Sequence, residues 1–225
     1  DFLLESTSDS LVRQFVACTV YDHFMDSKVM GAEAVAVHVY DRWFAPGKVK
    51  MNNDMDLLNA RIFADFNRQS LIGEKAPELV MESLDGSHVE LFTGKDKSGR
   101  YRVLFFYDAD CAKCKLESIM LSNVLETEDF PIDFVAIYAG DNRQKWDSYV
   151  EDRLSFEVSR TKVLHLWDPT LDSDLQRKYG VLQTLRMFLV RPDRVIIGRG
   201  LDTQALSMML HGIFDDVQLE YGSEE

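Results

Sequence analysis

The chain has 225 residues, 46% of them hydrophobic, and a formal net charge of −13 at pH 7. This composition suits a globular protein with a sizeable core, and the acidic excess argues against nucleic acid or an anionic membrane surface as a partner. No apolar run approaches the roughly 20 residues needed to cross a bilayer, and three cysteines are too few for a disulfide-stapled scaffold.

Residues from about 8 to 70 show the apolar spacing of amphipathic helices. We expect three helices, the first capped by Ser8 or Ser10 and the others at about 32–44 and 54–69. The side chains predicted to face a core are Leu11, Val12, Phe15, Val16, Thr19, Val20 and Phe24, then Val35, Ala36, Val39, Tyr40 and Trp43, then Leu57, Leu58, Ile62, Phe63 and Phe66. We interpret residues 1–70 as a helical packing segment without chemistry of its own.

The pattern changes near residues 71–77, after which short β-type runs alternate with helical ones. A hairpin around Asp85-Gly86 opens this part, and residues 102–107 are apolar enough for a strand buried on both faces. The later elements predicted are a helix at 111–125, a strand at 132–138, a helix at 143–150, a strand at 163–167, a helix at 171–179, a hairpin at 187–200 and a helix at 203–211. This order predicts an α/β domain over residues 71–225, with a mixed sheet covered on both faces.

Cys111 and Cys114 form a Cys-x-x-Cys motif where the buried strand gives way to a helix. A helix N-terminus carries partial positive charge and unpaired amides, and both favour a thiolate. We therefore expect Cys111 to be the more exposed nucleophile and Cys114, one turn inside, to resolve a mixed disulfide. The lysines that flank Cys114 would favour the thiolate, whereas the aspartates that precede Cys111 would oppose it.

Two cysteines at this spacing can also supply half of a zinc site. The sequence contains no second Cys-x-x-Cys and no nearby Cys-x-x-His, so His165 and Cys18 are the distant candidates for further ligands. A metal-binding dithiol is therefore a third hypothesis. Cys18 lies on the apolar side of the first helix, where it is interpreted more simply as a small buried thiol.

Several short motifs in residues 71–212 follow one family pattern. They are the opening motif at 72–77, the hairpin at 84–91, the strand and Cys-x-x-Cys helix at 103–117, and the segments at 166–169, 178–181 and 188–193. With them, this part of the chain resembles the TlpA/ResA-like thioredoxin-fold proteins of bacterial cell envelopes. The helical segment, above all at residues 28–35, is similar to the amino-terminal extension of a subset often found as lipoproteins.

The resemblance implies a thiol-disulfide oxidoreductase with a thioredoxin-like sheet, whose catalytic residues Cys111 and Cys114 exchange with protein thiols and disulfides. It implies no cofactor and no metal, and a place in the periplasm or cell envelope of a Gram-negative bacterium. The chain begins at Asp1 without a methionine, so we expect a processed or trimmed form, which leaves room for a lipid anchor upstream. The sequence defines neither the redox direction nor the oligomeric state.

Three positions beside the dithiol depart from the family pattern. Family members have Thr-Pro before the strand at Phe188, with the proline cis, and this chain has Thr184-Leu185. Ala109 and Ile119 replace two further prolines. A non-proline cis peptide costs roughly 3 kcal/mol more than the trans form, so we expect Leu185 to be trans or strained.

These departures leave two main hypotheses open. In a thiol-disulfide oxidoreductase, Ala112, Lys113, Thr184 and Leu185 would border the bound substrate. In a divergent site, the chain would be a redox-inactive or weakly active thioredoxin-fold module that binds a partner or a glycan-related ligand.

Overall fold

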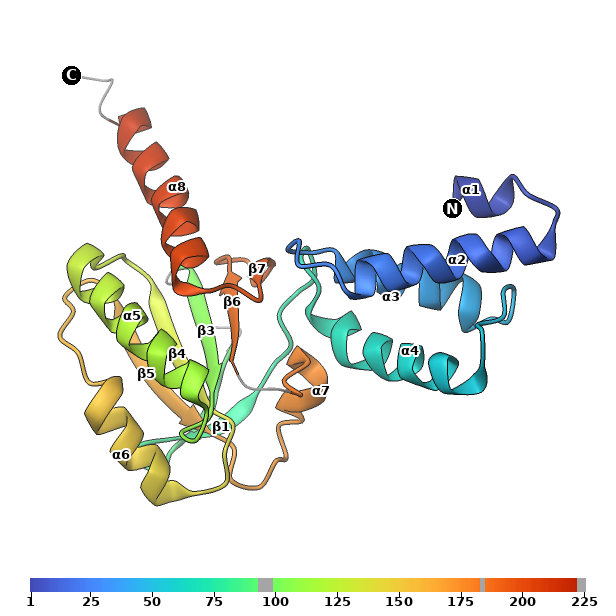
Figure 1. Ribbon diagram of the computed structural model, residues 1–225. Coiled ribbons are helices and arrows are strands. Elements are labelled where there is room, and N and C mark those ends of the chain that lie inside the picture. Colours follow the sequence, from blue (N-terminus) through green and yellow to red (C-terminus); the bar gives the residue numbers. More distant parts are fainter. Residues whose placement is uncertain (93–98, 183–184, 222–225) are drawn as a thin grey trace.

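The computed structural model describes residues 1–92, 99–182 and 185–221 of the chain. Figure 1 shows a group of helices beside a sheet that carries helices of its own. The first group consists of α1 (Phe2–Glu5), α2 (Ser10–Met25), α3 (Glu33–Val39), the π-helix η1 (Tyr40–Phe44), α4 (Asp54–Asn67) and the short 3-10 helix η2 (Arg68–Ser70). None of the described helices is long and apolar enough to span a membrane.

Two details of the predicted helical segment are wrong. The cap of α2 is Asp9, whose carboxylate accepts hydrogen bonds from the amides of Leu11 and Val12, because Asp supplies the same acceptor as the predicted serines. The predicted core face of α2 is also wrong at Leu11 and Phe15, which are 74% and 72% exposed. The helix packs instead through a stripe that contains Ala17, Cys18 and Tyr21. Further predicted core residues that are exposed are Val12, Thr19, Leu57, Leu58 and Ile62.

Among the described residues, the strands form one seven-stranded sheet in the order β2-β1-β5-β4-β3-β6-β7. They are β1 (Val80–Ser83), β2 (His88–Glu90), β3 (Arg102–Tyr107), β4 (Asp133–Tyr138), β5 (Lys162–Trp167), β6 (Arg186–Val190) and β7 (Ile196–Arg199). The central strands β3, β4 and β5 are parallel, whereas the other pairs are antiparallel. The predicted mixed sheet is confirmed.

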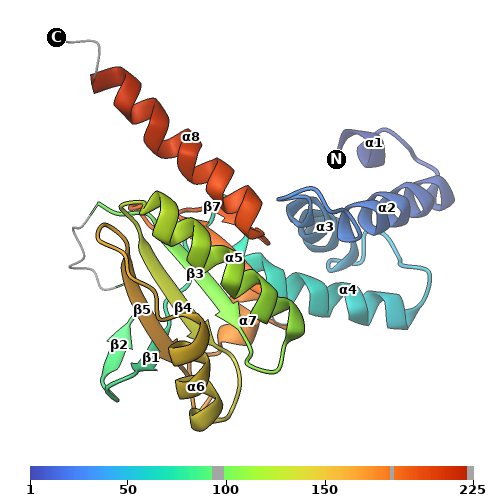
Figure 2. The same cartoon turned by 60° about the vertical axis from the view of Figure 1, so that its left-hand side comes forward.

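Helices cover both faces of this sheet, as Figure 2 shows. One face packs against α5 (Ala112–Glu128), α6 (Arg143–Arg153) and α8 (Thr203–Tyr221), and the other against α7 (Leu175–Tyr179). A hydrophobic core lies on each face of the sheet, and alternate residues of β3 point into the two cores. Phe105 is buried on the first face and Phe106 on the second, and neither has any exposed surface. The apolar run predicted to be buried on both faces is therefore a central strand.

The largest differences from the predicted helix bounds are at α7 and α8. The helix expected from residue 171 begins at Leu175, because Leu171 and Asp174 adopt positive φ angles that a helix does not accommodate. The last helix continues beyond the expected residue 211 to Tyr221. By contrast, α5 runs without interruption past Ile119, where the family proline is absent.

The helical segment meets the sheet at a buried ion pair. Arg199 of β7, whose side chain is 1% exposed, donates from Nη1 to Glu33 Oε1 at 2.8 Å and from Nη2 to Asn67 Oδ1 at 2.6 Å. Close by, Gly180 has a φ of +65°, and a Cβ there would lie 2.6 Å from the carbonyl oxygen of Phe66. Only glycine fits this approach of the chain to α4. The division into domains 1–70 and 71–225 stays a prediction.

Candidate functional site

Cys111 occupies the N-cap of α5, directly after the turn that leaves β3. Its backbone is extended, with φ −74° and ψ 111°, and its Sγ accepts a hydrogen bond from the amide of Cys114 at 3.1 Å. Its own amide donates to the carbonyl oxygen of Asp108 at 3.2 Å. The sulfur therefore takes the place of a capping oxygen, where the helix end favours negative charge.

The two sulfur-bearing residues differ in access. Cys111 is partly exposed, whereas Cys114 has no exposed surface and belongs to the core between the sheet and α5. Ala112 and Lys113 lie between them and are exposed on the first turn of the helix. A large substrate can thus reach Cys111 first, with Cys114 one turn behind it.

An ion pair lies beside the dithiol. Lys145 Nζ of α6 donates to Asp110 Oδ2 at 2.6 Å, and this hydrogen bond holds the pKa of the Asp110 carboxyl below its usual value. Lys145 thereby offsets the acid next to Cys111, an effect that the sequence predicted only for the lysines that flank Cys114.

Lys145 was not predicted as a member of the site, although a signal was present. The parallel strands β3 and β4 end together, with Tyr107 opposite Tyr138. The start of α6 therefore had to lie at the same sheet edge as the dithiol.

Tyr149 of α6 lies behind both cysteines. Its ring stacks on Tyr107 with centroids 4.7 Å apart, and its hydroxyl is hydrogen-bonded to the Ser118 hydroxyl at 2.8 Å. Burial raises the pKa of Tyr149 to about 12, and negative charge on Cys114 and Cys111 acts in the same direction. Near neutral pH, Tyr149 is therefore an uncharged hydroxyl close to both sulfur atoms.

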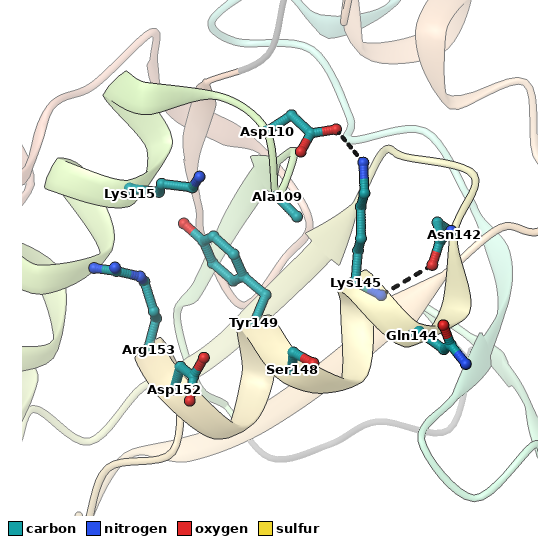
Figure 3. Close-up of a pocket in the computed structure, with 10 residues that line it drawn as sticks. All are labelled: Ala109, Asp110, Lys115, Asn142, Gln144, Lys145, Ser148, Tyr149, Asp152 and Arg153. Carbon is teal, nitrogen blue, oxygen red and sulfur yellow. Dashed lines mark hydrogen bonds and ion pairs between the residues drawn. The ribbon is translucent and has the colours of Figure 1, made fainter.

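A cavity of about 450 Å³ opens between the start of α5 and one side of α6, and Asp110, the residue before Cys111, is part of its wall. Figure 3 shows the ring of Tyr149 in its wall, with Lys115 and Arg153 on one side of the ring and the Asp110–Lys145 pair on the other. Ala109, which replaces a family proline, also lines it. The cavity is thus lined mainly by polar side chains, and it reaches Asp110, the residue directly before Cys111.

Leu185 is partly buried and packs against the same core cluster as Cys114. Its φ is +73°, a left-handed conformation that costs a non-glycine residue roughly 1–2 kcal/mol. Thr184, the other predicted residue of this loop, lies outside the described residues, as does the peptide bond that joins the two. The structure therefore places Leu185, Ala112 and Lys113 but leaves their contact with a substrate as a prediction.

Restoring the family proline at residue 185 should destabilise the protein. Proline fixes φ near −65°, so Leu185→Pro cannot keep the observed +73°, and we expect the free energy of unfolding to fall by more than about 1 kcal/mol. Urea unfolding followed by tryptophan fluorescence measures the change, with Leu185→Ala as the control for the lost side chain. A Leu185→Pro variant as stable as the wild type would contradict this reading of the loop.

The described parts of the chain contain no group of three His, Cys, Asp or Glu side chains arranged to hold a metal ion. Cys18 lies in the core of the helical segment. His165 lies on β5, where burial lowers its pKa to about 4. The described structure therefore does not gather these two candidates around Cys111 and Cys114.

Comparisons with known proteins agree with this fold. Residues 72–200 match the model of the AhpC/TSA family. The thioredoxin domain of a thiol-disulfide oxidoreductase from Bacteroides vulgatus is 19% identical, with a TM-score of 0.53 over 63% of this chain and 96% of that one. A thiol:disulfide interchange protein from Bacteroides sp. is 19% identical, with a TM-score of 0.52 over 65% and 92%. No curated protein sequence matches the chain.

One further structure covers the helical segment as well. A thioredoxin-like protein from Bacteroides caccae is 14% identical, with a TM-score of 0.64 over 93% of this chain and 73% of that one. At these identities the likeness shows the fold alone, and it confirms a thioredoxin-like sheet preceded by helices.

Proposed function

Because the chain belongs to the AhpC/TSA family, we propose that it is a thiol-disulfide oxidoreductase that acts on protein disulfides through Cys111 and Cys114. The observation that carries the proposal is the position of the Cys111 sulfur, which caps α5 and accepts the Cys114 amide at 3.1 Å. A hydrogen bond to a thiolate, together with the partial charge of the helix end, favours the reactive form of the sulfur.

The reaction consists of two thiolate displacements. The Cys111 thiolate attacks one sulfur of the substrate disulfide, whose S–S bond breaks, and the other sulfur leaves as a thiolate with the electron pair. The Cys114 thiolate then attacks Cys111 Sγ and releases the substrate as its second thiolate. The substrate gains two electrons, and the protein dithiol becomes a disulfide. An external thiol reductant returns the protein to its starting state.

Two regions would border the substrate in this scheme. Ala112 and Lys113 are exposed next to Cys111, and the loop with Thr184 and Leu185 leads into β6, which pairs with β3. We keep all four residues as proposed substrate contacts. No cofactor takes part in the exchange.

The reduction of insulin by dithiothreitol tests the proposal. Insulin chains precipitate once their disulfides are reduced, and catalytic amounts of the protein should shorten the lag before turbidity. A lag equal to that with no protein added would count against catalysis.

Leu185 supports a second candidate function. Its left-handed backbone stands where the family has a proline that presents backbone to a substrate peptide, and such a change is compatible with a thioredoxin-fold module that only binds a partner. A protein that leaves insulin intact while its cysteines stay alkylatable by iodoacetamide would favour this candidate.

We also propose a location in the periplasm or cell envelope of a Gram-negative bacterium, with a lipid anchor upstream of Asp1. The support is the resemblance of residues 28–35 and 71–212 to envelope proteins. Immunodetection in fractionated cells tests the location, and a signal confined to the cytoplasmic fraction would contradict it.

A further inference from the structure

The cavity between α5 and α6 has an unusual charge for this chain. Three cations line it, Lys115, Lys145 and Arg153, against two acids, Asp110 and Asp152, although the whole chain carries −13. The Lys145–Asp110 ion pair uses one charge of each sign. The remaining charges give a local excess of one positive charge.

Lys115 and Arg153 supply the two remaining positive charges, against the one negative charge of Asp152. Both are partly buried, and neither forms an ion pair with any residue in the described ranges. Lys115 comes from α5 and Arg153 from the end of α6, and both lie on the same side of the Tyr149 ring (Figure 3). Two cations held near one uncharged hydroxyl make a site for an anion, and a carboxylate fits because it accepts hydrogen bonds from several donors at once.

The position of the cavity indicates which carboxylate would enter it. Asp110 in its wall precedes Cys111, and Lys115 lies four residues after Cys111, about 6 Å along the axis of α5. An extended polypeptide advances about 3.3–3.6 Å per residue. A substrate chain whose cysteine sulfur meets Cys111 would therefore place the side chain two residues away over the cavity.

We propose that this cavity is a specificity site for the substrate, and that it binds an Asp or Glu side chain about two residues from the substrate cysteine. The inference rests on the proposed oxidoreductase activity and names the substrate class of that site. Lys115 and Arg153 attract the acidic side chain of the substrate. Lys145 pairs with Asp110 and so offsets the repulsion between Asp110 and that side chain. Asp152 repels the bound acid and therefore lowers the affinity.

Two short peptides test the proposal. Each has one cysteine as a mixed disulfide with thionitrobenzoate, and the residues two before and two after the cysteine are Glu in one peptide and Gln in the other. Prereduced protein attacks the peptide sulfur, because thionitrobenzoate has the lower pKa and leaves more readily. The release of thionitrobenzoate is measured by its absorbance during a single turnover. The rate with neutral dithiodipyridine serves as the baseline of thiol reactivity.

The measured quantity is the ratio of the Glu-peptide rate to the Gln-peptide rate within each variant, because a change in Cys111 reactivity cancels in that ratio. We expect a ratio of about five in the wild type, the scale of exposed ion pairs, and a fall towards one as ionic strength rises. Lys115→Glu and Arg153→Glu should bring the ratio to one or below. Asp152→Asn should raise it.

Lys162→Glu is the matched control. Lys162 is exposed at the start of β5, and the dithiol lies at the opposite end of the parallel strands. This variant should leave the ratio at the wild-type value. Equal rates for both peptides in a wild type that reacts with dithiodipyridine would overturn the specificity site and leave the proposed function standing. A wild type inert to dithiodipyridine and both peptides would instead contradict the proposed function itself.

Discussion

The replacement Cys111→Ser is expected to abolish the reduction of insulin, with a fall in rate of at least roughly 10³-fold, because a serine hydroxyl is almost entirely un-ionised at neutral pH and the thiolate is the attacking species. The fold should survive, since the serine oxygen can accept the same hydrogen bond from the Cys114 amide. Turbidity kinetics measure the rate, and far-ultraviolet circular dichroism checks the fold.

Cys18→Ala is the matched control for the loss of a thiol. Burial raises the pKa of Cys18, and the nearby charge of Asp22 adds to the shift, so this thiol stays protonated inside the helical segment. The variant should reduce insulin at the wild-type rate. A Cys111→Ser variant that keeps more than a small fraction of the activity, or a Cys18→Ala variant that loses it, would place the chemistry elsewhere.

The replacement Glu33→Ala is expected to lower the free energy of unfolding by roughly 3 kcal/mol, because it leaves the buried charge of Arg199 without its anionic partner. Arg199 has a side chain that is 1% exposed, and Glu33 is its anionic partner at 2.8 Å. Burial lowers the pKa of Arg199 and of Arg186, and Glu33 opposes the shift of both. One carboxylate therefore stabilises two cations where the helical segment meets β6 and β7. Urea unfolding measures the change.

The exposed pair Arg68–Asp41 provides the comparison. Its nitrogen and oxygen are 2.7 Å apart, but the two side chains are 42% and 41% exposed, so Asp41→Ala should cost no more than about 1 kcal/mol. If Glu33→Ala cost no more than Asp41→Ala, the junction would not depend on this ion pair.

The elements that could be predicted from the sequence are those that carry a local signal. The apolar run of β3 predicted a central strand, and the Cys-x-x-Cys motif after it predicted the helix end at Cys111. Both are found in the structure because burial on two faces and capping depend on residues close together in the chain.

The features that the sequence analysis missed depend on contacts between residues far apart in the chain. Lys145 reaches Asp110 only because β3 and β4 are parallel neighbours, and Arg199 meets Glu33 from the other end of the chain. The core face of α2 was predicted wrongly for a related reason. Apolar spacing, as at Leu11 and Phe15, shows only which side chains are able to be buried. Which of them are buried depends on the elements that pack against the helix, and Leu11 and Phe15 stay exposed.

The central claim is that the Cys111 sulfur attacks the substrate and that Cys114 resolves the product, and trapping with Cys114→Ser tests it most directly. The variant lacks the resolving thiol, so after incubation with insulin it should accumulate a mixed disulfide. Intact mass spectrometry should find one insulin chain attached, and peptide mapping should locate it at Cys111. The adduct should disappear with dithiothreitol and be absent from Cys111→Ser. No adduct with Cys114→Ser, or an adduct at Cys18, would contradict the account.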